Sequence, residues 1–237
     1  MAKFGVGQPV KRVEDQRLLT GHGRYTDDIN MDGQAFGFVL RSPHAHARIE
    51  AIDTSAAAAA PGVLGVFTAA DFGSTEAGVP CFIPLKNKDG SGRADPLHPI
   101  LCKDEVNYVG DNVAFIVAET LLQAKDAAEL VEVDYAELPA VAGTAEAIEP
   151  GRPQVHPEAP GNLAFDWFHG DEAEVEAAFR KAAHVTKVEL INNRLVCNAM
   201  EPRAAVAAFD RATGELVVQT ATQGPWAFRD TLAQNLG

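Results

Sequence analysis

The stretch NVAFIVAETLLQAKDAAELVEVDY, residues 112–135, contains three consecutive patterns that decide the fold. Its first seven residues are apolar except for Asn112, which is typical of a strand with both faces covered. Residues 119–130 place apolar side chains on one side of a helix, and residues 131–135 alternate as a half-buried strand does. The stretch therefore predicts a buried strand, an amphipathic helix and a second strand in direct succession.

The residues before this stretch predict an earlier strand–strand–helix–strand series, and one more strand that precedes residue 112. They comprise strands at 35–41 and 45–53, a short helix at 56–60, and strands at 63–68 and 106–109. Thr54 and Ser55 precede the alanine run as capping residues, and Pro61 and Gly62 end it. Residues 73–99 are rich in glycine, proline and charged residues, so we expect an irregular excursion there. Helices and strands are mixed without a regular βαβ alternation, which predicts an α+β fold.

A second unit follows a linker that contains five prolines. Its predicted elements are a helix at 172–183, a strand at 184–192, two strands at 204–209 and 215–222, and a helix at 225–236. Gly214 lies in the turn between the last two strands, where a hairpin loop needs the positive φ that glycine adopts freely. Pro225 suits the first turn of the final helix because it has no backbone N–H to leave unpaired.

The composition excludes several classes of function. The chain has 237 residues and a formal net charge of −13, whereas nucleic-acid binding needs a basic face. No run of about 18 apolar residues exists, so we expect no membrane span. The first ten residues carry no export signal, and three cysteines suit reduced, buried thiols, so we expect a cytoplasmic protein. Without a Cys-x-x-Cys motif, we expect no iron–sulfur cluster or zinc ion held by this chain alone.

Several short phrases are weak singly but specific in their order and spacing. They are GHGRYTDDI (21–29), RSPHAHARI (41–49), PGV (61–63), FTAAD (67–71), VNYVGD (106–111), VAET (117–120), VDY (133–135), LPAV (138–141), MEPRA (200–204) and TATQ (220–223). Together they resemble the molybdenum-cofactor (large) subunit of the xanthine dehydrogenase/aldehyde oxidase family. Within that family, the chain is most similar to carbon monoxide dehydrogenase-like large subunits.

The resemblance implies four parts along the chain. These are an irregular N-terminal arm at residues 1–18, an α/β-hammerhead domain at 19–138, a Pro-rich linker at 139–164, and the start of the first molybdopterin-binding domain at 165–237. That last domain, itself α+β, is expected to be incomplete here, because the family's glycine-rich cofactor loop and general base come further downstream.

The resemblance also implies an activity. In this family, a molybdopterin-bound molybdenum hydroxylates an aldehyde, carbon monoxide, a purine or an N-heterocycle with oxygen from water, and the protein supplies no direct metal ligand. Iron–sulfur clusters and FAD, on partner subunits or other domains, carry the electrons away. The expected partners are therefore an iron–sulfur subunit, a FAD subunit and a small-molecule substrate, with homodimerisation plausible for the full enzyme. We expect no complete set of catalytic residues in this chain, and no activity from the chain alone.

Two further interpretations remain open. The chain could be a natural split subunit whose cofactor site a second chain completes, or a non-catalytic assembly module that keeps the hammerhead fold. Retention of Gln223 and its approaching strand favours a part of an enzyme, because a scaffold has no need of them.

Gln223 is the candidate cofactor-binding residue, since it matches the family glutamine whose amide approaches an oxo ligand of the molybdenum. A neutral amide donates a hydrogen bond without adding a charge; the alternative is a strand-end glutamine bonded to backbone. Glu201 is expected to pair with Arg203 or to bond to backbone rather than to act as a base. His44 and His46 share one strand face, but without a third ligand nearby we expect packing and no metal site.

Overall fold

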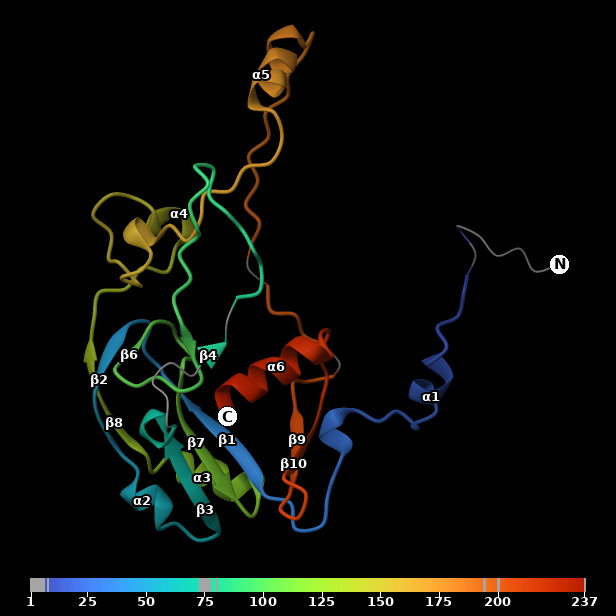
Figure 1. Cartoon of the computed structure of the whole chain (residues 1–237), viewed down its shortest axis with the longest axis vertical. Helices are drawn as coiled ribbons and strands as arrows, with labels where there is room; N and C mark the ends of the chain where they lie inside the picture. The colour runs from blue at the N-terminus through green and yellow to red at the C-terminus, as the bar shows by residue number, and fades with distance from the viewer. Residues whose placement is uncertain are drawn as a thin grey trace, which may run out of the picture. The chain divides into compact units, whose positions relative to one another are not determined.

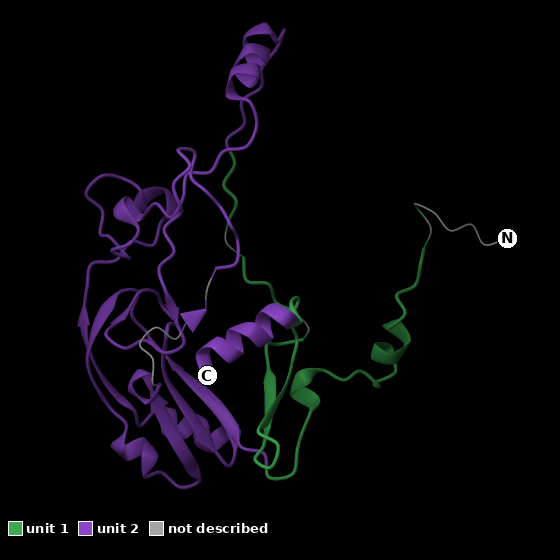
Figure 2. Ribbon diagram, in the orientation of Figure 1, with its two compact units in different colours: residues 1–33, 190–225 green, residues 34–189, 226–237 purple. Residues whose placement is uncertain are grey.

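The structure, a computed structural model, describes residues 7, 9–72, 78–79, 81–193, 195–199 and 201–236. Its mixture of helices and antiparallel strands confirms the predicted α+β class (Figure 1). Two compact units are present: residues 1–33 with 190–225, and residues 34–189 with 226–237 (Figure 2). Parts of the predicted N-terminal arm and of the 73–99 excursion, together with Met200 of the MEPRA phrase, lie outside the described residues.

A three-stranded antiparallel sheet forms the centre of the larger unit. Its strands are β1 (Phe36–Arg41), β7 (Asn112–Ala118) and β3 (Val63–Thr68), in the order β1-β7-β3 (Figure 1). Alternate residues of β7 belong to two different core clusters, Ile116 to one and Val113 to the other. The central strand is therefore covered on both faces, which explains its continuous apolar sequence.

Two helices pack on this sheet, α2 (Ser55–Ala58) and α3 (Leu121–Ala128). Thr120 caps α3, because its Oγ1 accepts a hydrogen bond from the Gln123 N–H at 3.2 Å. Thr54 is the N-cap residue of α2, as expected, but its side chain makes no capping hydrogen bond; the Ser55 N–H donates to Asp53 Oδ1 at 2.8 Å. The strand β3 ends in a short 3-10 turn, η2 (Ala69–Asp71), which Thr68 caps.

A second antiparallel sheet has the order β6-β2-β8, from β6 (Glu105–Val106), β2 (Ala47–Asp53) and β8 (Glu132–Glu137). The strand β6 stops at Val106 rather than at the predicted residue 109. The chain turns there because the Asn107 N–H donates to the buried Asp111 carboxylate at 2.7 Å. Within the excursion, β4 (Gly78–Val79) and β5 (His98–Pro99) form a short antiparallel pair.

The linker is less irregular than expected, since it contains α4 (Thr144–Ala147) and the 3-10 turn η3 (Pro160–Asn162). The predicted helix after it is present as α5 (Glu172–Lys181), and the final helix as α6 (Pro225–Leu236). The predicted strand at 184–192 is wrong: those residues are described, but they form no ladder with any other described residue. An alternating pattern makes a strand only when a second strand lies beside it.

The smaller unit contains α1 (Asp15–Leu19), the 3-10 turn η1 (Thr26–Asp28), and a hairpin of β9 (Ala205–Asp210) and β10 (Glu215–Thr220). The helix α1 begins inside the arm that was expected to be irregular. Ion pairs of Arg12 with Asp15 and of Arg17 with Glu14 accompany it. No helix among the described residues is long and apolar enough to cross a membrane.

Candidate functional site

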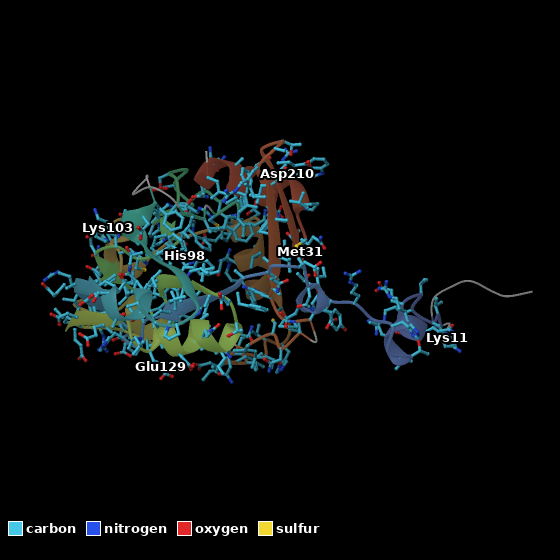
Figure 3. The ribbon with its side chains drawn as sticks, turned by 90° about the horizontal axis from the view of Figure 1, so that it is seen from below. Lys11, Met31, His98, Lys103, Glu129 and Asp210 are labelled. Carbon is cyan, nitrogen blue, oxygen red and sulfur yellow. The ribbon has the colours of Figure 1, made fainter. Side chains whose placement is uncertain are left out.

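The hairpin of β9 and β10 carries the chain toward Gln223. Its antiparallel register runs from Glu215 opposite Asp210 to Thr220 opposite Ala205. The turn is built as expected, with Gly214 at φ 73°, and the Asp210 carboxylate (Figure 3) accepts the Ala212 N–H at 2.8 Å. Both strands are therefore set in one register from the turn to the open end.

The open end of the hairpin lies before Gln223. Here Thr220 Oγ1 donates to the Ala204 carbonyl at 2.8 Å. The strand β10 ends at Thr220, two residues before its predicted end, because β9 begins at Ala205 and offers no further partner. Beyond it, the Gly224 N–H donates to Thr222 Oγ1 at 3.2 Å, and α6 then starts at Pro225. Gln223 thus occupies a short bend between a strand and a helix.

The Gln223 side chain is exposed, and its amide makes no hydrogen bond with the residues that the structure describes. The alternative in which this glutamine bonds to backbone therefore has no support among those residues. A free, neutral amide can donate two hydrogen bonds to an external acceptor. An oxo group bound to a metal is such an acceptor, so the donor chemistry at this position fits a molybdenum cofactor.

Glu201 does not pair with Arg203. Its Oε1 accepts instead from the backbone N–H of Thr26 at 3.2 Å and from Thr26 Oγ1 at 3.3 Å. Of the two arrangements that the sequence left open, the bond to backbone is the one present. Sequence reasoning could not supply the partner, because Thr26 lies 175 positions away.

His44 and His46 precede β2, which begins at Ala47 rather than at the predicted residue 45, and both contact protein groups. His46 lies between two acceptors, the Pro139 carbonyl at 2.8 Å from Nδ1 and Glu105 Oε1 at 2.7 Å from Nε2. The His44 ring lies against Tyr135 in a tilted arrangement, with ring centroids 4.7 Å apart and an interplanar angle of 53°. The described residues contain no group of three or more His, Cys, Asp or Glu side chains placed to hold a metal ion.

The cysteines differ from the expectation of buried thiols. Cys102 is buried, but Cys81 and Cys197 are exposed, so that expectation is wrong for two of the three. Cys81 has a partner that the sequence did not indicate: its Sγ lies 2.8 Å from a guanidinium nitrogen of Arg93. A hydrogen bond from the Ile83 backbone and the Arg93 guanidinium together lower the pKa of Cys81. Burial, with Asp111 nearby, raises the pKa of Cys102 to about 12.

A groove of about 650 Å³ lies between residues 87–94 and residues 158–166 of the larger unit. The Lys88 N–H donates to the Asp166 carbonyl at 2.7 Å, and the Ala94 N–H to the Ala164 carbonyl at 2.8 Å, so the walls are tied together. Its lining contains acidic and basic side chains but none of the residues singled out from the sequence.

Two family models match the chain. The model described as "Aldehyde oxidase and xanthine dehydrogenase, a/b hammerhead domain" matches residues 20–139. The model described as "Molybdopterin cofactor-binding domain" matches residues 155–237. The first of these alone accounts for half of the chain, and the second contains the hairpin and Gln223.

Curated proteins and solved structures agree with these matches. The chain is 35% identical to the carbon monoxide dehydrogenase large chain of Afipia carboxidovorans, over 97% of this chain and 29% of the relative. It is 36% identical to the nicotine 6-hydroxylase large subunit of Paenarthrobacter nicotinovorans, over 98% of this chain and 28% of the relative. The structure of quinoline 2-oxidoreductase from Pseudomonas putida 86 matches with a TM-score of 0.80 at 35% identity, over 99% of this chain and 29% of that one.

The chain thus spans less than a third of the length of these relatives, and it corresponds to their N-terminal part. The two domain types, the fold and the identities agree with the resemblance carried by the short phrases. The chain belongs to the aldehyde oxidase and xanthine dehydrogenase family and forms part of a molybdenum-cofactor subunit.

Proposed function

We propose that this chain contributes to the cofactor site of a molybdenum hydroxylase, with Gln223 donating a hydrogen bond to an oxo ligand of the bound molybdenum. The observation that carries the proposal is the exposed Gln223 amide, which bonds to none of the described residues and lies in the segment that matches a molybdopterin-binding domain. The cofactor, when bound, would supply hydroxylation of a carbon centre with oxygen from water.

The chain's own contribution is binding and orientation. The Gln223 amide is a donor that adds no charge beside an anionic group. The α6 N-terminus follows two residues later, and backbone N–H groups in the first turn of a helix also favour anions. A general base and a substrate pocket are not assigned to residues of this chain. Its relatives are named for carbon monoxide, nicotine and quinoline, which supports a small carbonyl-type or N-heterocyclic substrate as the class.

The proposal includes partner subunits. Relatives carry names such as "large chain" and "complex subunit gamma", which supports assembly with further chains. We assign iron–sulfur clusters and FAD to such partners or to other domains, homodimerisation to the full enzyme, and a cytoplasmic location to the complex. We also propose that the domain boundaries lie at residues 18/19, 138/139 and 164/165.

The test compares Gln223→Ala with Gln219→Ala in the assembled enzyme that contains this chain. Gln219 is a matched control, because it is an exposed glutamine on β10, four residues before Gln223. Loss of one preorganised donor lowers kcat by about 100-fold in comparable sites. We expect that loss, with an altered Mo(V) electron paramagnetic resonance signal, for Gln223→Ala and wild-type behaviour for Gln219→Ala. An unchanged signal and kcat in Gln223→Ala would exclude the proposed role.

A further inference from the structure

Two sequence phrases that the cofactor proposal does not use meet in the smaller unit. Thr26 belongs to GHGRYTDDI, and Glu201 to MEPRA, 175 positions later. One carboxylate oxygen, Glu201 Oε1, accepts both the Thr26 N–H at 3.2 Å and the Thr26 hydroxyl at 3.3 Å. Thr26 is 8% exposed and Glu201 is half-buried. Hydrogen bonds to a carboxylate shielded from water are stronger than those between neutral groups.

The donor side of this contact is preorganised. In η1, the Tyr25 N–H donates to Asp28 Oδ2 at 2.9 Å, and the Asp28 N–H donates to the Tyr25 carbonyl at 3.1 Å. The Ile29 N–H closes the turn on the Thr26 carbonyl at 3.1 Å. This turn lies against β9 within the same unit. Both donors of Thr26 are therefore presented to Glu201 by a turn that is already closed.

On the acceptor side, a short path through the chain connects Glu201 to Gln223. Three positions separate Glu201 from Ala204, whose carbonyl accepts the Thr220 hydroxyl at 2.8 Å. Thr220 pairs with Ala205 at the last rung of the hairpin, and Gln223 follows three residues later. The position of the segment before β9 therefore sets the position of the open end of β10.

We propose that Glu201 is a positioning residue for Gln223. By binding both donors of Thr26, it anchors the segment before β9 to the N-terminal turn η1. Through the Thr220–Ala204 hydrogen bond, this anchor holds the bend that carries Gln223. The inference rests on the proposed role of Gln223, but it concerns a contact that exists without any cofactor.

The test is hydrogen–deuterium exchange of the 237-residue chain without cofactor, read in peptides that cover residues 215–224. Glu201→Ala removes the acceptor of two hydrogen bonds, and we expect exchange at this open end to become about tenfold faster. Glu215→Ala is the matched control. Glu215 lies at the turn end of β10, and its exposed carboxylate binds none of the described residues. Equal exchange in Glu201→Ala and wild type would overturn the proposal.

Conservative variants separate positioning from general destabilisation. Glu201→Gln keeps an oxygen that accepts from both donors, so it should restore slow exchange; if it behaves like Glu201→Ala, the proposal is wrong. Thr26→Val removes the hydroxyl but keeps the N–H, whereas Thr26→Ser keeps both donors. If Glu201→Ala does not fold, faster exchange in Thr26→Val than in Thr26→Ser supports the anchor, and equal rates refute it.

The two proposals fail in different ways. Gln223→Ala should leave the exchange of β10 unchanged, since its amide binds no described residue, and should alter only the spectrum of the assembled enzyme. Glu201→Ala should change the exchange first and the molybdenum signal as a consequence. A changed exchange with an unchanged signal keeps the anchor but refutes Gln223 as its target.

Discussion

The helices α3 and α5 have the same kind of sequence pattern but different surroundings. In α3, the apolar side is buried at Ala124, Ala127 and Ala128, against the strands β1 and β7. In α5, the apolar side has Val175 50% exposed and Phe179 56% exposed, and the helix has no buried residue. Periodicity and caps specify a helix, whereas burial depends on what the rest of the polypeptide places beside it.

The difference extends beyond the two helices. We name residues 34–137 the core region and residues 165–193 the arm region, which is distinct from the N-terminal arm at residues 1–18. The core region contains both clusters of buried apolar side chains. In the arm region, Leu190 and Ile191 are 84% and 88% exposed, and residues 184–192 pair with no described strand. Stability should therefore be concentrated in the core region.

The largest expected effect is a contrast between Ile116→Ala and Phe179→Ala. Ile116 is fully buried on β7, and its truncation should lower the free energy of unfolding by about 2–5 kcal/mol. Phe179→Ala removes more atoms, yet it should cost less than about 0.5 kcal/mol because no core is lost. Urea unfolding followed by circular dichroism measures both. A decrease of more than about 2 kcal/mol for Phe179→Ala would show that α5 is packed like α3, which would contradict the difference between the two helices.

A smaller effect is expected where a buried carboxylate is compared with an exposed one. Asp111 is 3% exposed and accepts the Asn107 N–H, so Asp111→Ala leaves buried donors unpaired and should cost about 1–3 kcal/mol. Asp171 caps α5 by accepting the Glu174 N–H at 2.9 Å. Asp171→Ala should lower the free energy that stabilises α5 by about 1 kcal/mol. The urea midpoint of the core region should not change. Equal midpoints for the two variants would contradict this difference.

The smallest effect is a pH dependence in the core region. Burial lowers the pKa of His46, but the hydrogen bonds to the Pro139 carbonyl and to Glu105 outweigh it and raise the pKa above 6.5. The charged ring donates to both acceptors, so its stabilisation is fully present below pH 6.5 and is lost as pH rises through the raised folded-state pKa.

In urea unfolding, the free energy of unfolding should therefore fall by less than about 1 kcal/mol as the pH rises from 6 to 8. His46→Gln should abolish this decrease. The matched control in the arm region is His184→Gln, at an exposed histidine that lies 3.2 Å from Thr186 Oγ1. It should keep the wild-type pH profile. Persistence of the pH-dependent loss in His46→Gln would assign it to another group.

Much of the fold could be predicted, because its causes are local. The apolar run of β7, the Thr120 cap of α3 and the Gly214 turn each depend on a few adjacent residues. The strand ends were harder to predict. The strand β10 is shorter than its pattern because β9 begins at Ala205, and β6 is shorter because Asp111 captures the Asn107 N–H.

Less of the candidate site could be predicted. Gln223 was found through its match to a family phrase, since an exposed glutamine in a bend carries no periodic signal. For Glu201 the sequence indicated a bond to backbone as one of two arrangements, but it did not indicate the partner, because no local pattern links Glu201 to Thr26. The Cys81–Arg93 contact also joins residues without a shared pattern.

The sequence by itself determined the α+β class, the helices α2, α3, α5 and α6, the hairpin and the family, because periodicity, caps, turns and short phrases act over a few residues. Only the tertiary structure decided which amphipathic helix is buried, where the strands end, and that Thr26 donates hydrogen bonds to Glu201. These outcomes require groups far apart in the chain to meet, and the free energy of such contacts exists only once the chain has folded.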